Sequence, residues 1–242
     1  MRCLVVIPAY NEAKNIISVL DGISSLVQDV DILVINDCSK DDTENVVRIK
    51  GYNVISLCCN LGYSGAILTG LKYASEKNYD YVIQFDGDGQ HDPNDIKKLI
   101  NEIEKEKCDI VIGSRFLEKN TYNHGLFRKI GTSTFKLLIK TITGTQITDP
   151  TSGLQIINKK AFEYYVRSGN YPDYPDANLI ILMLKLGYKI IEIPATMHDR
   201  LSGIGMHDSP YKNVKYMISM FYSLIIFALK GSGKKERSKY GL

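Results

Sequence analysis

The chain has 242 residues, of which 44% are hydrophobic and 24% charged, and its formal net charge is +3. This composition is ordinary for a globular protein and excludes disordered and fibrous classes, and the length favours one large domain. The tail from Lys230 holds five basic residues and one acidic residue, so the net charge of the rest of the chain is about −1. The body therefore lacks the basic face of a nucleic-acid-binding protein, and no nucleic-acid partner is expected.

Short apolar runs alternate with segments of helical periodicity along the first half of the chain. The runs CLVVIPA, DILVIND, NVISLC, YDYVIQFD and DIVIGSRF are rich in β-branched residues and predict five strands. Their alternation with helical segments predicts βαβ units, an α/β fold and a mainly parallel central sheet.

Two of the intervening helices have recognisable starts. The first is expected to begin near Asn11, and the helix after the fourth strand with Asp92 as N-cap and Pro93 in its first turn. Apolar residues three and four apart predict their buried faces. These are Ile16, Leu20 and Ile23 in the first helix, and Ile96, Leu99, Ile100 and Ile103 in the second.

The second half of the chain elaborates the same domain, because turn residues multiply after Arg115 without any linker. We expect one domain over residues 1–211, an apolar helix over 212–229 and a basic tail over 230–242. The run YMISMFYSLIIFAL is too short to span a bilayer comfortably, and with the basic tail it predicts an interfacial membrane helix. A core helix or an oligomer contact is the alternative.

The five cysteines are odd in number and show no CxxC spacing. We expect them to be reduced residues packed in the core of a cytoplasmic protein. The strand-like run CLVVIPAY begins at the third residue, without the length or flanks of a signal peptide, so no export signal is expected. The four histidines share no ligand spacing, which argues against a zinc site.

Two aspartates follow the fourth strand, in YVIQFDGDGQHDP. Asp86 and Asp88 lie in a tight glycine-containing loop where their carboxylates can converge, and two such charges are stable together when a cation lies between them. Mg²⁺ or Mn²⁺ fits, since these hard ions take one or two carboxylates and complete their coordination with water and substrate phosphates. The alternative is a turn that leads into the helix capped by Asp92.

Two nucleotide-binding classes are disfavoured by the turn after the first strand. That turn, PAYNEAKN, has no GxGxxG, which argues against a dinucleotide-dependent oxidoreductase. It also lacks the glycine-rich basic loop that a sugar-nucleotide pyrophosphorylase needs for a triphosphate.

Seven motifs in order resemble the family 2 glycosyltransferases: VVIPAYNEAKNI, VINDCSKDDT, NLGYSGAILTGL, DGDGQHDP, GSRF, DPTSGLQIIN and EIPATMHDR. The resemblance covers about residues 3 to 205 and is nearest to dolichyl-phosphate mannose synthase-like enzymes and bacterial surface-polysaccharide transferases. It implies a Rossmann-like GT-A fold that binds a nucleotide-diphosphate sugar, a UDP- or GDP-sugar, and transfers the sugar with inversion.

The resemblance also implies roles for individual residues. Asp37 would bind the base, Asp86 would face ribose and sugar, and Asp88, helped by Gln90, would hold Mg²⁺ or Mn²⁺ on the diphosphate. Two arginines would meet phosphate charge. The implied nucleoside pocket is Pro8, Ala9, Tyr10 and Glu12, and the arginines are Arg115 and Arg200.

The motifs depart from the family pattern at two places that concern the acceptor. Met206 stands where the dolichyl-phosphate branch usually has lysine, and Asn178 replaces the second acidic residue that the polysaccharide branch often carries. A sugar-hydroxyl acceptor would need a base, for which Asp176 and Asp149 are the candidates. A lipid phosphate would need little help because it is already ionised.

We therefore expect a membrane-linked acceptor at the inner face of the cell membrane, with polyprenyl phosphate favoured over a glycan hydroxyl. A membrane surface or a membrane protein is the expected partner. The rival hypothesis is a non-catalytic scaffold that keeps a degenerate transferase fold.

Overall fold

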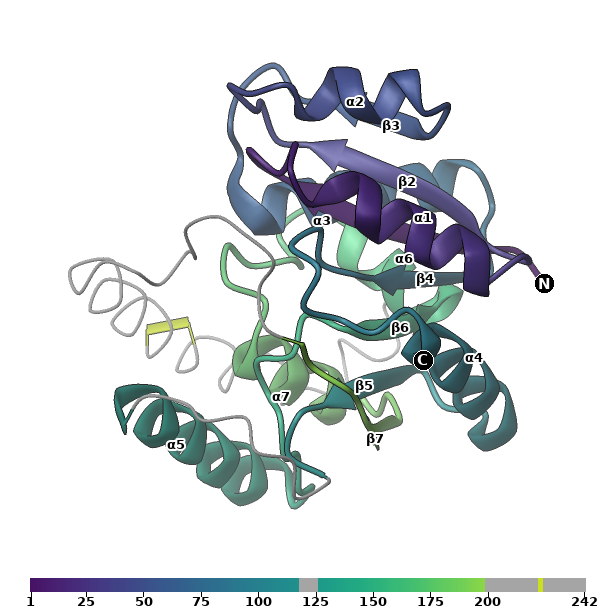
Figure 1. The fold of residues 1–242 in the computed structure, drawn as a ribbon. Helices are drawn as coiled ribbons and strands as arrows, with labels where there is room; N and C mark the ends of the chain where they lie inside the picture. The colour runs from purple at the N-terminus through teal and green to yellow at the C-terminus, as the bar shows by residue number, and fades with distance from the viewer. Residues whose placement is uncertain (118–125, 199–221, 224–242) are drawn as a thin grey trace.

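The computed structural model describes residues 1–117, 126–198 and 222–223 (Figure 1). A seven-stranded sheet forms its centre, in the order β3-β2-β1-β4-β6-β5-β7. The strands are β1 (Cys3–Ala9), β2 (Asp31–Asn36), β3 (Asn53–Ser56), β4 (Tyr81–Gln84), β5 (Ile110–Ser114), β6 (Gln155–Asn158) and β7 (Ile190–Pro194).

The predicted α/β fold and mainly parallel sheet are confirmed. β1 pairs in parallel with β2 and β4, β2 with β3, and β5 with β7. All five strands predicted from the apolar runs form. β6 is the antiparallel member, and it lies between β4 and β5 and pairs with both.

Helices cover both faces of the sheet (Figure 1). On one face α1 and α4 pack with Val5, Ile7 and Ile83, and on the other α3, α6 and α7 pack with Leu4, Val6 and Val82. The helices are α1 (Ile16–Leu26), α2 (Thr43–Ile49), α3 (Gly62–Glu76), α4 (Asn94–Glu106), α5 (Leu126–Thr143), α6 (Lys159–Val166) and α7 (Ala177–Lys185).

The alternation of side chains along β1 explains why both faces are apolar, since successive residues of a strand point to opposite sides. α3 approaches β1 closely at Gly70, where an added Cβ would lie 2.3 Å from Cγ1 of Val6. Any side chain at this position would push the helix away from the sheet. This packing fixes the N-terminus of α3 beside the ends of β1 and β2.

Both predicted helix starts are displaced, the first by several residues and the second by one. α1 begins at Ile16 rather than near Asn11, because Asn11 has a positive φ of 58° and its amide is tied to Ser39. α4 begins at Asn94 with Pro93 at the N-cap, one residue after the predicted N-cap Asp92. Asp92 still supports this end of the helix, because its Oδ1 accepts from the amide of Asn94 at 2.9 Å. The expected buried faces form, except that Ile100 is half-buried.

The cysteine prediction is partly wrong. All five thiols are free, but Cys58 and Cys59 are exposed and Cys38 is half-buried, whereas Cys3 and Cys108 are in the core as expected. Burial raises the pKa of Cys3 to about 12, so that this thiol is protonated and inert at neutral pH.

Several predictions fall outside the described residues: Arg200, Met206, the basic tail, and the apolar segment apart from residues 222–223. Within the ranges 1–117, 126–198 and 222–223, the structure contains no helix that is both long and apolar enough to cross a membrane.

Candidate active site

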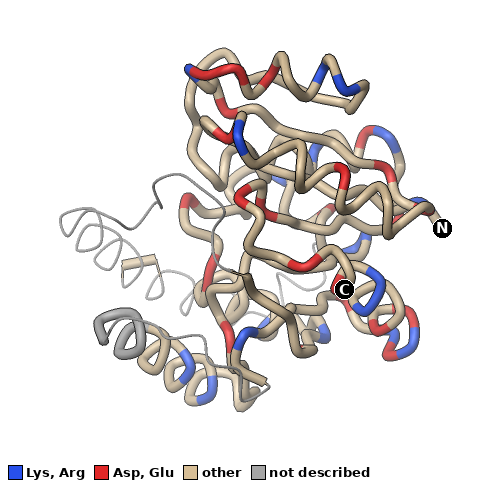
Figure 2. The backbone as a smooth tube through the Cα atoms, in the orientation of Figure 1, with Lys and Arg blue, Asp and Glu red and all other residues tan. Residues whose placement is uncertain are grey.

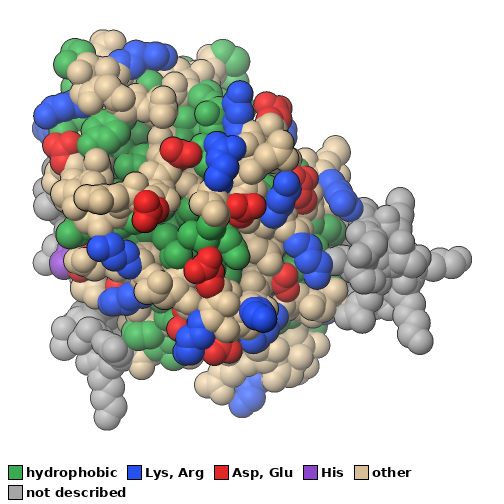
Figure 3. All heavy atoms as spheres, turned by 90° about the vertical axis from the view of Figure 1, so that its right-hand side faces the viewer, with side chains coloured by type: hydrophobic (Ala, Val, Ile, Leu, Met, Phe, Trp, Pro, Cys, Tyr) green, Lys and Arg blue, Asp and Glu red, His purple; other side chains and the backbone are tan. Residues whose placement is uncertain are grey.

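The predicted site residues gather where β1, β2 and β4 end. The parallel register places Ala9 beside Asn36, and the amide of Asp37 donates to the carbonyl of Ala9 at 2.9 Å. Acidic residues recur along this side of the molecule (Figure 2). On the side seen in Figure 3, acidic and basic side chains are intermingled. Ligands of open α/β sheets bind beyond the carboxyl ends of the strands, so the acidic edge is the candidate site.

Asp37 is held against the start of α3. Its side chain, in a residue only 3% exposed, accepts from the amides of Leu61 and Gly62 at 2.7 and 2.8 Å. Burial raises the pKa of Asp37 above its ordinary value, and the two N–H groups oppose that rise. The carboxylate thus orders the segment after β3, and a role toward the base stays a prediction.

The four residues of the expected nucleoside pocket differ in accessibility. Tyr10 is 42% exposed at the end of β1, whereas Ala9 is buried and Pro8 is half-buried. Glu12 is buried and accepts from Nδ2 of Asn15 at 2.7 Å. Tyr10 is therefore the member of this group best placed to contact a planar base from solution.

The loop after β4 carries the two aspartates. Oδ2 of Asp86 lies 3.0 Å from Nε2 of His91, and Oδ1 of Asp88 accepts from the amide of Gln90 at 3.1 Å. Burial opposes ionisation of Asp86, but His91 first, and then Tyr63 and the charge of Arg115, together keep the pKa of Asp86 below its ordinary value. Asp86 is accordingly an anion at neutral pH.

The donor set of this loop fits Mg²⁺ or Mn²⁺. Asp86, Asp88 and Gln90 offer carboxylate and amide oxygens, which suit hard cations. Oδ1 of Asp86 is buried without a hydrogen-bond partner among the described residues. The described part of the chain contains no cluster of three or more His, Cys, Asp or Glu residues able to hold a metal.

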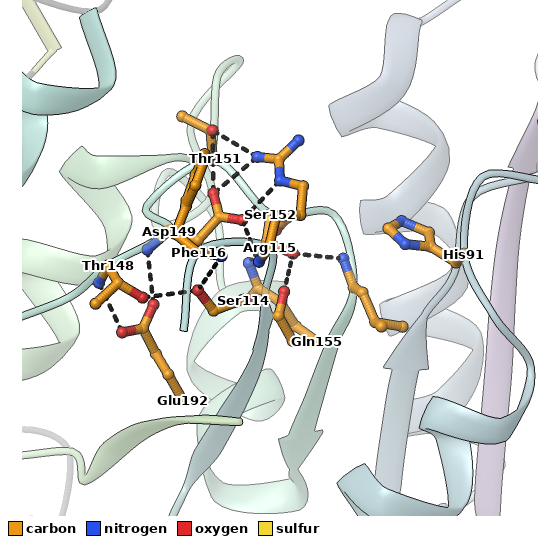
Figure 4. A network of polar contacts seen from close by, with 12 residues as sticks. His91, Ser114, Arg115, Phe116, Thr148, Asp149, Thr151, Ser152, Gln155 and Glu192 are labelled. Atoms are coloured by element: carbon orange, nitrogen blue, oxygen red, sulfur yellow. Dashed lines mark hydrogen bonds and ion pairs between the residues drawn. The ribbon is translucent and has the colours of Figure 1, made fainter. Parts of the chain in front are cut away.

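Arg115 and Asp149 form a buried ion pair (Figure 4). Oδ2 of Asp149 accepts from Nε and the backbone amide of Arg115 at 2.6 and 3.0 Å, and Oδ1 accepts from Nη2 at 2.7 Å. Nη2 also donates to Thr151 at 2.9 Å. Asp149 is 0% exposed. Its carboxylate is thus engaged on both oxygens, which argues against its proposed role as a base.

Glu192 of β7 binds the backbone of the segment that carries Asp149. Its two carboxylate oxygens accept from the amides of Thr148 and Asp149 at 2.6 and 2.7 Å (Figure 4). Burial raises the pKa of Glu192 above its ordinary value, while the two N–H groups favour its ionised form. The segment that carries Asp149 is therefore fixed through its backbone as well as through Arg115.

Asp176 and Asn178 lie at the start of α7. Asp176 is half-buried at the N-cap position, with no capping bond from its side chain. The capping oxygen is instead Oδ1 of Asn178, which accepts from the amides of Asp176 and Leu179 at 3.0 and 2.8 Å. Nδ2 of Asn178 donates to Ser223. Asn178 is thus structural, and Asp176 is the remaining candidate for a base.

Four residues in or beside the site have no role predicted from the sequence: Tyr63, His91, Gly153 and Glu192. Tyr63 and Gly153 stand inside the quoted motifs NLGYSG and DPTSG, and the glycine-rich pattern was a signal of close approach. His91 stands in the motif DGDGQHDP, next to the predicted metal ligand Gln90. No local pattern marks Glu192, because its partners are backbone amides distant in sequence.

Comparison with known proteins finds sugar transferases among the relatives of this chain. An undecaprenyl-phosphate mannosyltransferase of Micrococcus luteus is 28% identical over 84% of this chain and 86% of its own. A UDP-N-acetylglucosamine–dolichyl-phosphate N-acetylglucosaminyltransferase of Methanococcus voltae is 29% identical over 93% and 95%.

The fold matches a solved structure, that of glucosyl-3-phosphoglycerate synthase of Mycobacterium tuberculosis in complex with Mn²⁺, UDP-glucose and phosphoglyceric acid. The TM-score is 0.67 at 22% identity, over 94% of this chain and 79% of that one. The family model described as glycosyl transferase family 2 matches residues 4–166. With the acidic edge at the ends of β1, β2 and β4, these matches show that the chain belongs to the family 2 glycosyltransferases.

Proposed function

We propose that this protein transfers a sugar, with inversion, from a nucleotide-diphosphate sugar to a polyprenyl phosphate. One observation carries the choice of acceptor: both carboxylate oxygens of the buried Asp149 are bound to Arg115, which leaves Asp176 as the remaining candidate for a base. A hydroxyl acceptor needs a base, whereas a phosphate monoester is already ionised at neutral pH. The two polyprenyl-phosphate transferases among the relatives support the same choice.

In this proposal the acidic loop receives the donor. Asp86 faces ribose and sugar, Asp37 and Tyr10 lie on the side of the base, and Asp88 with Gln90 would hold Mg²⁺ or Mn²⁺. Such an ion stabilises the negative charge that develops on the departing nucleotide diphosphate. The donor can be a UDP- or a GDP-sugar.

Arg115 acts mainly through the loop that it orders. Its Nε and Nη2 are bound to Asp149, so the pair is close to neutral and its guanidinium has less charge to offer a phosphate than an unpaired arginine would have. Arg200, in the EIPATMHDR motif, would then supply the phosphate contact, a role that stays a prediction.

Replacing Asp176 by Asn separates the two acceptor classes. If the acceptor is a polyprenyl phosphate, its ionised oxygen attacks without a base, so Asp176→Asn should keep most of its turnover, within about tenfold. A general base would contribute about 10²–10⁴-fold. The measurement is transfer of radiolabelled sugar to polyprenyl phosphate, and separately to glycan hydroxyl acceptors, at saturating donor.

Asn at position 176 keeps the size of the side chain, and the unfolding midpoint shows whether the start of α7 is intact. A loss above about 10²-fold with an intact fold, together with activity only on hydroxyl acceptors, would assign the protein to polysaccharide synthesis with Asp176 as base. Donor binding without transfer to either acceptor class would favour the non-catalytic scaffold.

We also propose that the chain binds the inner membrane surface as a peripheral protein, through the apolar segment and the basic tail. The tail holds five Lys and Arg residues, and attraction of such groups to anionic lipid is screened beyond about 8 Å at physiological ionic strength. Changing Lys234, Lys235, Arg237 and Lys239 to Gln should weaken co-sedimentation with anionic vesicles several-fold. Wild-type binding should also fall with salt.

The matched control replaces four basic residues of the body by Gln: Lys72 on α3, and Lys97, Lys105 and Lys107 on or beside α4. These changes alter the net charge equally but lie far from the tail in sequence, and we expect vesicle binding to be unchanged. Equal losses in the two variants would mean that net charge, and not the tail, governs binding.

A further inference from the structure

Three polar atoms in one part of the site are buried without a hydrogen-bond partner among the described residues: Oη of Tyr63, Oδ1 of Asp86 and Nδ1 of His91. Unpaired buried polar atoms are rare in proteins and each costs free energy, so a group of three requires an explanation. Asp86 links them, because its Oδ2 is bound to His91 and its charge acts on Tyr63.

The two oxygens of Asp86 have different surroundings. The side chain of Asp86 is 30% exposed, yet Oδ1 is buried, so the exposed part of the residue is not Oδ1. Oδ2 is held by the ring of His91, a side chain only 3% exposed. The carboxylate therefore turns Oδ1 into the protein, toward Tyr63. Its exposed side, which is the side of Oδ2, is left for a ligand, and we call it the free edge of Asp86.

His91 is fixed in position and in tautomer. Its ring packs edge-on against Phe85, with centroids 5.4 Å apart, and its backbone bridges to Met197. Nδ1 is buried without a partner among the described residues, whereas Nε2 faces a carboxylate oxygen, which can only accept, so the proton of this contact is on Nε2. The 3.0 Å contact is thus a hydrogen bond from Nε2 to Oδ2 of Asp86.

Tyr63 approaches the same carboxylate from α3. A Cβ built on Gly153 would lie 2.7 Å from Oδ2 of Asp86, 3.0 Å from Oη of Tyr63 and 3.1 Å from Oδ1 of Asp86. These three atoms therefore surround one point above Gly153, whose lack of a side chain lets them come together. Burial first, then the charge of Asp86, raises the pKa of Tyr63 well above its ordinary value, so its hydroxyl keeps its proton and is a donor.

We propose that Tyr63 and His91 are positioning residues that clamp Asp86 from two sides and aim its free edge at the donor. His91 holds Oδ2, the hydroxyl of Tyr63 faces the buried Oδ1 as its hydrogen-bond donor, and Gly153 leaves the room that both need. The inference rests on the proposed function, since it takes Asp86 to face the ribose and sugar of the donor. It adds residues that act through Asp86 and do not contact the donor themselves.

The test is a double-mutant cycle on donor affinity. Tyr63→Phe removes the hydroxyl that faces Oδ1 of Asp86, and His91→Ala removes the hydrogen bond to Oδ2. Asp86→Asn removes the charge that both residues would position. Loss of groups that orient a binding carboxylate typically costs about 10–100-fold in affinity or activity. We expect each single variant to bind UDP-sugar or GDP-sugar with Mn²⁺ about 10-fold or more weakly by calorimetry.

The decisive measurement is the loss of donor affinity that each of the two substitutions causes in a protein that already carries Asp86→Asn. If Tyr63 and His91 act through Asp86, then Tyr63→Phe and His91→Ala should change affinity by less than about twofold in Asp86→Asn, because the group that they position is already gone. Tyr73→Phe, on the same helix α3 with its ring packed against the core, is the matched control and should bind donor as the wild type does.

Three outcomes would overturn the clamp: undiminished donor affinity in folded Tyr63→Phe and His91→Ala, losses that are as large in the Asp86→Asn background, or a wild type that binds no nucleotide sugar. Failure of the wild type to use polyprenyl phosphate, with donor binding and the cycle as expected, would overturn the acceptor assignment and support the clamp. Thermal unfolding of each variant shows that the fold is kept.

Discussion

Asp88→Asn should lower Mn²⁺-dependent nucleotide binding by at least about 10²-fold and leave the fold intact. An asparagine can still accept the amide of Gln90 through Oδ1, as Asp88 does at 3.1 Å, so the turn is preserved. What is lost is the charge that a hard cation requires. The measurement is calorimetric titration of UDP and GDP with and without Mn²⁺, together with the unfolding midpoint.

This substitution distinguishes the two interpretations of the acidic loop. If Asp88 serves only the turn, Asn is an equal replacement and metal-dependent binding persists, which would contradict the proposed metal role. Glu104→Gln is the matched control, because this exposed carboxylate lies on α4 away from the loop. It should leave nucleotide binding unchanged in the presence and in the absence of Mn²⁺.

Asp149→Ala should be strongly destabilising, with a loss of about 3–5 kcal/mol in the free energy of unfolding. The change leaves Nε, Nη2 and the backbone amide of Arg115 without their acceptor in a site where the arginine side chain is 14% exposed. An uncompensated buried charge is the most costly consequence of breaking such a pair. Urea denaturation measures the loss.

Two further variants separate the ion pair from general damage. Glu44→Ala breaks the exposed pair with Arg48 on α2 and should cost less than about 1 kcal/mol. The double variant Arg115→Met and Asp149→Leu removes both charges and should recover part of the stability lost in Asp149→Ala. A stable Asp149→Ala that has lost turnover would instead assign a catalytic role to Asp149.

Much of the fold is predictable from the sequence because strand and helix periodicity report burial. The five apolar runs become β1 to β5, and the spacing of Ile16, Leu20 and Ile23 predicts the buried side of α1. The start of α1 is less predictable, because Asn11 is held by Ser39, 28 residues away. Local pattern reports the buried face of a helix more reliably than its first residue.

The position of β6 is beyond local pattern. Its four residues resemble any short apolar strand, and its antiparallel place between β4 and β5 depends on where the chain returns after α5. The exposed Cys58 and Cys59 show the same limit. Cys58 ends the predicted run NVISLC and Cys59 follows it, but β3 ends at Ser56 and the chain leaves the core before reaching them.

The sequence by itself determined the family, the strand-end aspartates and the residue types offered to a cation, because motifs in register and buried strands that end in carboxylates are visible along the chain. Only the tertiary structure decided what each carboxylate meets. Asp37 caps the start of α3, Asp149 neutralises Arg115, and Asp86 lies beside His91 and Tyr63. The physical reason is that a hydrogen bond or ion pair acts over about 3 Å in space, and folding, not sequence spacing, decides which polar groups come that close.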